Sequence, residues 1–291
     1  MGWRILVATD GSTSAEQAAR LGALLAGDGA VHLLHAVSLA PVGPLSALDA
    51  VSTLVAGSPG SLAKEWELSR EREGLELLEH ARVEVERART PARIEAEQLA
   101  GRPADLILAR AQEGQFDLIA LGSHGRGTLA RTILGSVSAE VLQHAERPVL
   151  FARRDSVRSL LVGVDGSEPG LRAAALAGEV ARRTGAEVSF LYAAEVPIDT
   201  YVEGRARVKV AFEAEAQRAF EAARQALGVP VSGEHLVFHE PAHALVVRAE
   251  QTGVDLVVVG RRGRTQAPKL LLGSVSRRVA LHAVASVLVV P

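Results

Sequence analysis

The sequence predicts an α/β fold made of two tandem domains, each a five-stranded parallel sheet of the Rossmann-like type covered by helices. Apolar runs of strand length alternate with amphipathic runs of helix length, this pattern occurs twice, and each half has one glycine-rich segment directly after an apolar run. The length of 291 residues, 48% of them apolar, suits two domains with a core each. We place the domains at residues 1–152 and 157–291, with the linker ARRDSVR at 152–158.

The first domain opens with a strand, a helix and a second strand. The near-continuous apolar run WRILVAT at 3–9 is typical of a central strand covered on both faces. The capping box Thr13-x-x-Glu16 predicts a helix that continues to about residue 26, and an apolar run at 31–37 predicts the second strand. In a parallel sheet such a unit has a right-handed crossover.

The same alternation continues to the end of the first domain. A long charged amphipathic helix at 62–89 ends before Thr90-Pro91, because the residue preceding a proline disfavours helical backbone. Pro103 suits the first turn of a helix that continues to about residue 114. The remaining expected elements are strands at 93–99, 117–121 and 149–152 and a helix at about 131–145. The second domain repeats this order.

The two halves are copies of one another, which we call copy one and copy two. ILVATDGS at 5–12 is echoed by LLVGVDGS at 160–167, and the glycine-rich segment at 122–150 is echoed at 260–288. From Gly101 onward the two copies align without a gap. The chain is therefore a tandem duplication.

Copy one carries extra residues after its second strand, in or near 41–60. The insertion is mostly small and apolar, with three prolines, and it follows the strand at the carboxyl edge of the sheet. We expect it to fold over the copy-one site or against copy two and to make the two pockets unequal, because long loops without structure are uncommon unless functional or disordered. The alternative is a mobile surface excursion.

Composition excludes several classes of protein. The 32 basic and 34 acidic residues give a formal charge of −2, which lacks the electrostatic footprint of a nucleic-acid binder. The absence of cysteine excludes disulfides, thiolate metal sites and thiol nucleophiles. No run approaches the roughly 20 apolar residues that span a bilayer. We expect a soluble, cytoplasmic protein that binds neither nucleic acid nor membrane.

The glycine-rich loop has the spacing Gly122-x2-Gly125-x9-Gly135-Ser136, which recurs in copy two as Gly260-x2-Gly263-x9-Gly273-Ser274. Glycines let backbone N–H groups approach phosphate oxygens, and a helix N-terminus adds partial positive charge at the same place. The serine hydroxyls can donate to a phosphate or ligate a cation, and Arg126, Arg131, Arg264 and Lys269 add positive charge. The alternative is that the glycines only make tight turns and the basic side chains are solvated.

These residues resemble the universal stress protein family, and specifically its tandem two-domain members. The resemblance covers nearly the whole chain, through DGS after the first strand, DLIALGSHGRG and DLVVVGRRGRT at the fourth strand, and GSVSAEVLQHA and GSVSRRVALHA in the last helix. It implies an adenine nucleotide alpha hydrolase-like fold, and the glycine spacing is the pattern of members that bind ATP. We therefore expect ATP with Mg²⁺ as the ligand.

The resemblance and the loop spacing together predict the ligand-binding residues. The aspartate after each first strand would lie near the adenosine, the residue ending each second strand would line the adenine, and the loop would hold ribose and phosphates. In copy one the residues are Asp10, Val37, Gly122, His124, Gly125, Arg126, Gly127, Gly135, Ser136, Val137 and Ser138. In copy two they are Asp165, Ala194, Gly260, Gly263, Arg264, Gly273, Ser274, Val275 and Ser276. We expect Gly122→Val or Gly135→Val to abolish the copy-one site by filling phosphate or ribose space.

Copy two departs from the family pattern. Thr265–Pro268 replace the small residues expected after the second loop glycine, and Ser286 stands where copy one has Pro148. Nucleotide binding is therefore less firmly predicted for copy two.

Residues 239–243 match the zinc-protease string H-E-x-x-H, which requires both histidines on one continuous helix. The alignment places Pro241 at the first turn of a helix, which does not suit that geometry. We expect satisfied or exposed histidines there rather than a metalloprotease, with weak metal binding by His235, His239 and His243 as an alternative.

The chain has no Walker A string and no obvious base to activate water at a γ-phosphate, so we expect at most weak hydrolysis and no catalytic residues. The preferred hypothesis is an ATP-binding stress or signalling module. The alternatives are an interaction module of the same fold without nucleotide binding, and a slow ATPase or nucleotidyl transferase. The protein partner is not indicated.

The apolar runs at 149–152 and 287–290 are candidate edge strands, which would invite aggregation if unpaired. The family resemblance implies that they pair antiparallel, so that the copies form an intramolecular pseudo-dimer. Further homodimerisation stays open.

Overall fold

The computed structural model describes residues 2–37, 59–125, 134–195, 205–264 and 272–291. In copy one the strands are β1 (Arg4–Ala8), β2 (Ala30–Val37), β3 (Arg93–Ala100), β4 (Leu118–Gly122) and β5 (Val149–Ala152), and the helices are α1 (Thr13–Ala26), α3 (Pro59–Arg87), α4 (Pro103–Glu113) and α5 (Ser136–His144). In copy two the strands are β6 (Ser159–Gly163), β7 (Glu187–Ala193), β8 (Gly233–Val237), β9 (Leu256–Gly260) and β10 (Ser286–Val290), and the helices are α6 (Glu168–Thr184), α7 (Arg205–Leu227), α8 (Pro241–Thr252) and α9 (Ser274–His282). Among these residues no helix is long and apolar enough to cross a membrane.

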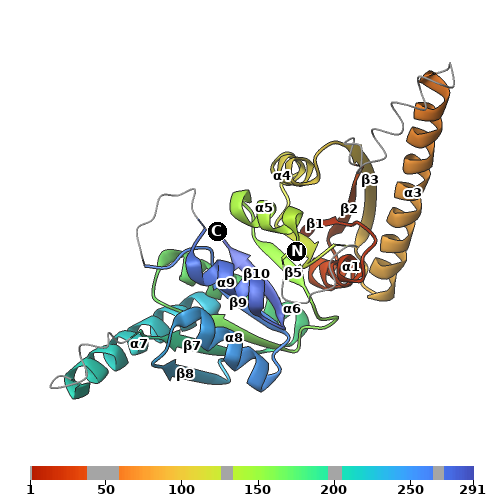
Figure 1. Ribbon diagram of the computed structural model, residues 1–291. Helices are drawn as coiled ribbons and strands as arrows, with labels where there is room; N and C mark the ends of the chain where they lie inside the picture. The colour runs from red at the N-terminus through yellow and green to blue at the C-terminus, as the bar shows by residue number, and fades with distance from the viewer. Residues whose placement is uncertain (1, 38–58, 126–133, 196–204, 265–271) are drawn as a thin grey trace.

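The strands form one sheet with the order β3-β2-β1-β4-β5-β10-β9-β6-β7-β8. All neighbouring strands within a copy are parallel. The two copies meet at the antiparallel pair β5–β10, where Leu150 lies opposite Leu288. The predicted antiparallel pairing of the fifth strands is therefore confirmed. Figure 1 shows α3 and α7 at opposite ends of the molecule, each projecting beyond the sheet.

Two apolar clusters cover the faces of the sheet. One lies beneath α1, α3, α6 and α7 and takes Ile5 from β1 and Val162 from β6. The other lies beneath α4, α5, α8 and α9 and takes Leu6 and Leu161 from the same strands. Each cluster contains residues of both copies, so the copies share a continuous core.

The order of elements follows the sequence prediction, but some helices begin elsewhere. Ser12 rather than Thr13 is the N-cap of α1, and its Oγ accepts a hydrogen bond from the Ala15 N–H at 3.2 Å. Helix α5 begins at Ser136 rather than near residue 131, because Gly135 has an extended backbone with φ −59° and ψ 154°. Helix α3 already begins at Pro59, and the rest of the 41–60 insertion lies outside the described residues, as does residue 131 itself.

Arginines from each copy donate to carbonyls at helix ends of the other copy. Arg183 reaches Leu25 in the last turn of α1, Arg153 reaches Ala280 in the last turn of α9, and Arg261 reaches the C-terminal end of α5. A cation at a helix C-terminus is favourable because the carbonyls there carry partial negative charge. Burial lowers the pKa of Arg153 to about 10. The copies are thus joined by polar as well as apolar contacts.

Ser286 belongs to this boundary between copies. Its Oγ accepts the backbone N–H groups of Arg153 and Arg154, each at 3.1 Å. The serine that replaces the proline of copy one therefore fastens the segment after β5 to β10, which explains a departure from the repeat without reference to a ligand.

Candidate functional site

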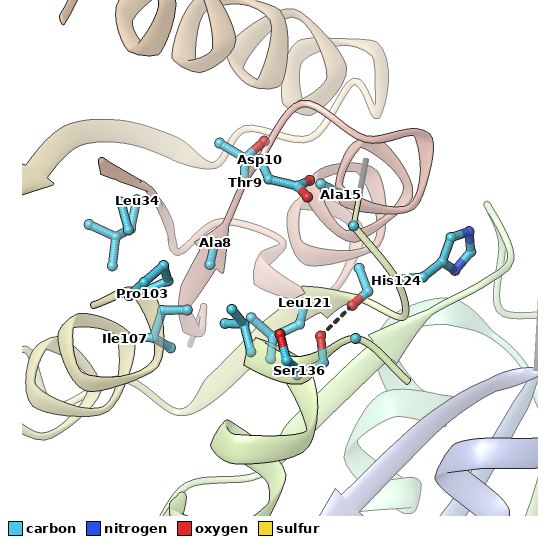
Figure 2. Close-up of a pocket in the computed structure, with 16 residues that line it drawn as sticks. Ala8, Thr9, Asp10, Ala15, Leu34, Pro103, Ile107, Leu121, His124 and Ser136 are labelled. Atoms are coloured by element: carbon cyan, nitrogen blue, oxygen red, sulfur yellow. Dashed lines mark hydrogen bonds between the residues drawn. The ribbon is translucent and has the colours of Figure 1, made fainter. Parts of the chain in front are cut away.

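Each copy has a cavity at the carboxyl ends of its strands, where ligands bind in open α/β sheets. The copy-one cavity has a volume of about 230 Å³ and is bordered by the ends of β1, β2 and β4 and the first turn of α5 (Figure 2). The copy-two cavity, of about 330 Å³, occupies the equivalent position at β6, β7, β9 and α9. The predicted residues that line copy one are Asp10, Gly122, His124, Gly125, Gly135, Ser136, Val137 and Ser138. Those that line copy two are Asp165, Gly260, Gly263, Arg264, Gly273, Ser274, Val275 and Ser276.

Arg126 and Gly127 lie outside the described residues, as do Arg131 and Lys269. The geometry of each site therefore rests on the two ends of its glycine-rich loop.

The aspartate after the first strand is held by the turn into the first helix. In copy one the Ser12 N–H donates to Asp10 Oδ1 at 3.0 Å. In copy two both the N–H and the Oγ of Ser167 donate to Asp165 Oδ1, at 2.9 and 2.6 Å. A Cβ atom at Gly125 would lie 2.8 Å from Asp10 Oδ2, and one at Gly263 would lie 2.7 Å from Asp165 Oδ2. The middle glycine of each loop is thus what lets the loop approach this carboxylate.

Gly122, at the end of β4, is required by packing rather than by space for a ligand. A Cβ atom there would contact Ser14 and would lie 2.8 Å from the Ala15 backbone nitrogen at the start of α1. In copy two a Cβ atom at Gly260 would lie 2.7 Å from the Pro169 carbonyl carbon at the start of α6. The expectation that a side chain at Gly122 would fill phosphate or ribose space is therefore wrong, because that side chain would meet α1.

Gly135, by contrast, has room for a side chain. A Cβ atom there would have its nearest neighbour at 3.6 Å, and the φ of −59° is open to any residue. In copy two a Cβ atom at Gly273 would lie 2.8 Å from the Arg261 carbonyl oxygen, so packing requires that glycine. Packing therefore does not explain the glycine at 135, which lines the copy-one cavity.

The first turn of α5 supplies hydrogen-bond donors to the cavity. Gly135 is the N-cap and has no side chain to cap the helix, so that no cap from the described residues engages the N–H groups of Ser136, Val137 and Ser138, which can donate to a ligand or water. The Ser138 hydroxyl donates to the Gly122 carbonyl at 2.9 Å, and in copy two the Ser276 hydroxyl donates to the Arg261 carbonyl at 2.7 Å. These two hydroxyls tie the helix to the loop.

The residues predicted to line the adenine each lie one position beyond the residue that lines the cavity. Ala36 and Ala193 line the cavities, whereas Val37 and Ala194 do not. Successive side chains of a strand point to opposite faces, and Ala194 belongs to the core beneath α6 and α7, on the face away from the cavity.

The apolar floor of the cavity was not found from the sequence. In copy one it consists of Leu34, Pro103 and Ile107, and in copy two of Leu191, Pro241 and Leu245. The one available signal was that Pro103 and Ile107 align without a gap with Pro241 and Leu245, so that the same apolar positions recur in both copies.

Two side chains predicted to face the ligand, those of His124 and Arg264, have local partners instead. Figure 2 shows the His124 ring directed away from Asp10 and Ser136, and its Nδ1 lies 2.8 Å from the Ser123 hydroxyl. In copy two, Arg264 Nε donates to the Asp165 carbonyl at 2.6 Å and the guanidinium pairs with Glu215. Local partners therefore compensate the charge of Arg264.

The H-E-x-x-H string forms a helix start. His239 precedes α8, and Glu240 is its N-cap, with carboxylate oxygens that accept the N–H groups of Ala242 at 3.1 Å and His243 at 2.9 Å. Burial opposes ionisation of Glu240, but these backbone hydrogen bonds and the Arg278 guanidinium, 3.2 Å from Glu240 Oε1, together lower its pKa. The described residues contain no group of three or more histidine, aspartate or glutamate side chains suited to hold a metal. The expected departure from zinc-protease geometry is confirmed.

The fold and the paired cavities define a tandem α/β protein with a candidate ligand site at the strand ends of each copy. The model of the universal stress protein family matches residues 3–153 and 156–291. A universal stress protein from Mycobacterium tuberculosis is 31% identical over 293 residues, covering 96% of this chain and 93% of that protein. The chain belongs to the universal stress protein family.

Solved structures share the fold. A universal stress protein from Archaeoglobus fulgidus superimposes with a TM-score of 0.66 at 21% identity, covering 99% of this chain and 97% of that chain. A second, from Pseudomonas aeruginosa, gives a TM-score of 0.63 at 17% identity, covering 99% of this chain and 93% of that chain. Both coverages extend over the tandem pair.

Proposed function

We propose that this chain is a nucleotide-dependent stress or signalling module that binds ATP with Mg²⁺ in the copy-one cavity. The observation that carries the proposal is the convergence of three features at one point: the Asp10 carboxylate, the glycines of the loop, and the open first turn of α5. Copy two repeats the arrangement.

Each part of the cavity suits a different part of the nucleotide. The apolar floor of Leu34 and Ile107 suits the adenine ring, and Asp10 lies where a carboxylate can accept hydrogen bonds from ribose hydroxyls. The N–H groups at the start of α5 suit the phosphates.

The donor set also fits a magnesium ion that arrives with the nucleotide. Ser136 offers a hydroxyl oxygen at the start of α5, where the phosphates would lie, and Mg²⁺ usually keeps several waters and phosphate oxygens among its ligands. When bound, the ion would neutralise phosphate charge, and Ser136 would hold it.

We propose weaker binding for copy two. The guanidinium of Arg264 is engaged by Glu215 and by the Asp165 carbonyl, so it is not free to compensate phosphate charge. The Tyr192 hydroxyl, which lies 3.3 Å from Arg264 Nη1, belongs to the same cluster, and burial raises the pKa of this tyrosine.

Calorimetric titration with ATP and Mg²⁺ tests the copy-one site, in a chain whose copy-two site is disabled by Gly263→Val. We expect Gly135→Val to lower the affinity at least tenfold, because its side chain would occupy the cavity at the phosphate end, at a position where a Cβ atom has room. The matched control is Ala139→Val, which changes an exposed residue of α5. Competition by ADP, AMP and cAMP then ranks the ligands.

Undiminished affinity in Gly135→Val would contradict the copy-one assignment. A second measurement is independent of any variant: the purified protein is denatured and the released nucleotide is identified by chromatography. If no nucleotide is released and none binds, the chain is an interaction module of the same fold. Phosphate release with and without Mg²⁺ tests for slow hydrolysis.

A further inference from the structure

Arg261 belongs to the loop of copy two, but its side chain reaches into copy one. The residue directly follows β9 and is 8% exposed. Its Nη1 donates to the Ala145 carbonyl at 2.5 Å and its Nη2 donates to the Gln143 carbonyl. These carbonyls lie at the C-terminal end of α5, where a positive charge is favourable.

The backbone of the same residue is tied to the anion-binding end of copy two. The Arg261 carbonyl accepts the Gly273 N–H at 2.9 Å and the Ser276 hydroxyl at 2.7 Å, and both donors belong to the start of α9. Arg261 also lines the copy-two cavity. One residue therefore connects the N-terminal end of α9 with the C-terminal end of α5.

The opposite end of α5 borders the copy-one cavity. Ser136 and Val137, in the first turn of α5, line that cavity. The helix has nine residues, which span about 13 Å. This distance exceeds the Debye length of about 8 Å at physiological salt, but Arg261 is buried and its charge is therefore screened less, so that both this charge and the alignment of α5 affect how well the first turn binds an anion.

One donor of Arg261 is left over. Its Nε is buried and has no hydrogen-bond partner among the described residues. Burial, together with the neighbouring charge of Arg262, lowers the pKa of Arg261. Because Arg261 lines the copy-two cavity, an anion bound there would partly offset the guanidinium charge.

Copy one has no equivalent connection from its own loop among the described residues. Ser123 stands at the position of Arg261, and its hydroxyl contacts the His124 ring. Arg153, the copy-one arginine that reaches α9, follows β5 and is not among the residues that line the copy-one cavity. The connection through a cavity-lining residue therefore leads from copy two to copy one.

We propose that Arg261 is a positioning residue for the copy-one site and couples the two sites negatively. An anion bound at the copy-two loop offsets the charge that Arg261 holds at the C-terminal end of α5, so occupancy of copy two loosens α5 and weakens nucleotide binding in copy one. The coupling rests on the proposed nucleotide binding, and binding free energies make it reciprocal.

Hydrogen exchange tests the coupling in the full chain. Copy one is disabled by Gly135→Val, and copy two is saturated with ATP and Mg²⁺, with saturation checked by calorimetry. We expect the last-turn amides of α5 to exchange about two- to fivefold faster with ATP, although α5 then contacts no ligand. When Arg261→Met is added, we expect ATP to leave the exchange rate of these α5 amides unchanged. Arg261→Lys keeps the positive charge and should retain part of the ATP-dependent increase in exchange.

The matched control is Arg262→Met, which removes the adjacent cation of the same loop but none of the bonds to α5. Its ATP-dependent change in α5 should persist. The coupling is overturned if α5 exchange is unchanged or slower with ATP, or if Arg261→Met shows the same increase. It is also overturned if copy two alone binds no ATP, an outcome that leaves the copy-one proposal standing. If the wild-type chain binds no nucleotide at all, the proposed function itself fails.

Discussion

Two glycines of the copy-one loop line one cavity for different physical reasons. At Gly122 a side chain would collide with the start of α1, so the glycine belongs to the fold. At Gly135 a Cβ atom would meet no atom of the described residues closer than 3.6 Å, and the backbone conformation does not require glycine. The same residue type in one motif thus serves packing at one position and ligand space at another.

This difference predicts that two conservative variants lose different amounts of stability. Gly122→Ala should lower the free energy of unfolding by about 1–3 kcal/mol, because the added methyl group overpacks the contact with α1. Gly135→Ala should lower it by no more than about 1 kcal/mol, the cost of replacing an N-cap glycine by alanine without a packing collision. Urea unfolding of both variants measures this, and equal losses of stability would contradict the distinction.

The same residues show what could be predicted from the sequence. The repeated spacing and the aspartate after the first strand led to residues that do line the cavities. The face of β2 could not be predicted, because its sequence AVHLLHAV belongs to a strand covered on both faces and lacks the polar alternation that identifies a buried face. The pattern therefore does not show that Ala36, rather than Val37, lines the cavity.

At the scale of elements, helix starts determine both sites, and they were predicted less accurately than the elements themselves. The repeat established the order of strands and helices, whereas the first residue of α5 depends on the extended backbone of Gly135. Helix α8 shows the opposite case, because Pro241 correctly predicted where the helix begins. Glu240, within the H-E-x-x-H sequence, is the N-cap of this helix. A proline is the stronger signal because its ring restricts the backbone directly.

The cap of α8 can be tested through stability. Glu240→Ala should lower the free energy of unfolding by about 1 kcal/mol, since two backbone N–H groups lose their acceptor. The pKa of Glu240 is lowered from its usual 4.5, so its contribution is present above that pH and is lost as the pH falls through the folded-state pKa. In thermal unfolding measured from pH 7 to pH 3, the unfolding temperatures of wild type and Glu240→Ala should approach each other as the pH falls.

Glu240→Gln is the control, because it keeps an oxygen acceptor without the charge. It should retain part of the stability at pH 7 and show less dependence on acid. A constant difference between wild type and Glu240→Ala across the whole pH range would contradict the role of the ionised carboxylate.

At the scale of the whole molecule, the junction between copies has internal symmetry. Leu150 lies opposite Leu288, which is its counterpart in the repeat, and Phe151 and Val149 lie opposite Val287 and Val289. The register is therefore that of a two-fold axis through the Leu150–Leu288 pair. The family resemblance implied this antiparallel pairing, and the repeat supplies the two equivalent apolar edges that can satisfy each other within one chain.

The symmetry predicts the behaviour of copy one without copy two. A fragment of residues 1–157 would expose β5, whose four residues are all buried in the full chain. Because the register is symmetric, a second fragment can replace β10, with Leu150 opposite Leu150 and Phe151 opposite Val149. We expect the fragment to dimerise, as measured by sedimentation, whereas Leu150→Arg should give a monomer by placing a charge at the centre of the new interface. An aggregate of higher order in place of a dimer, or a dimer unaffected by Leu150→Arg, would show that the fragment associates through another surface.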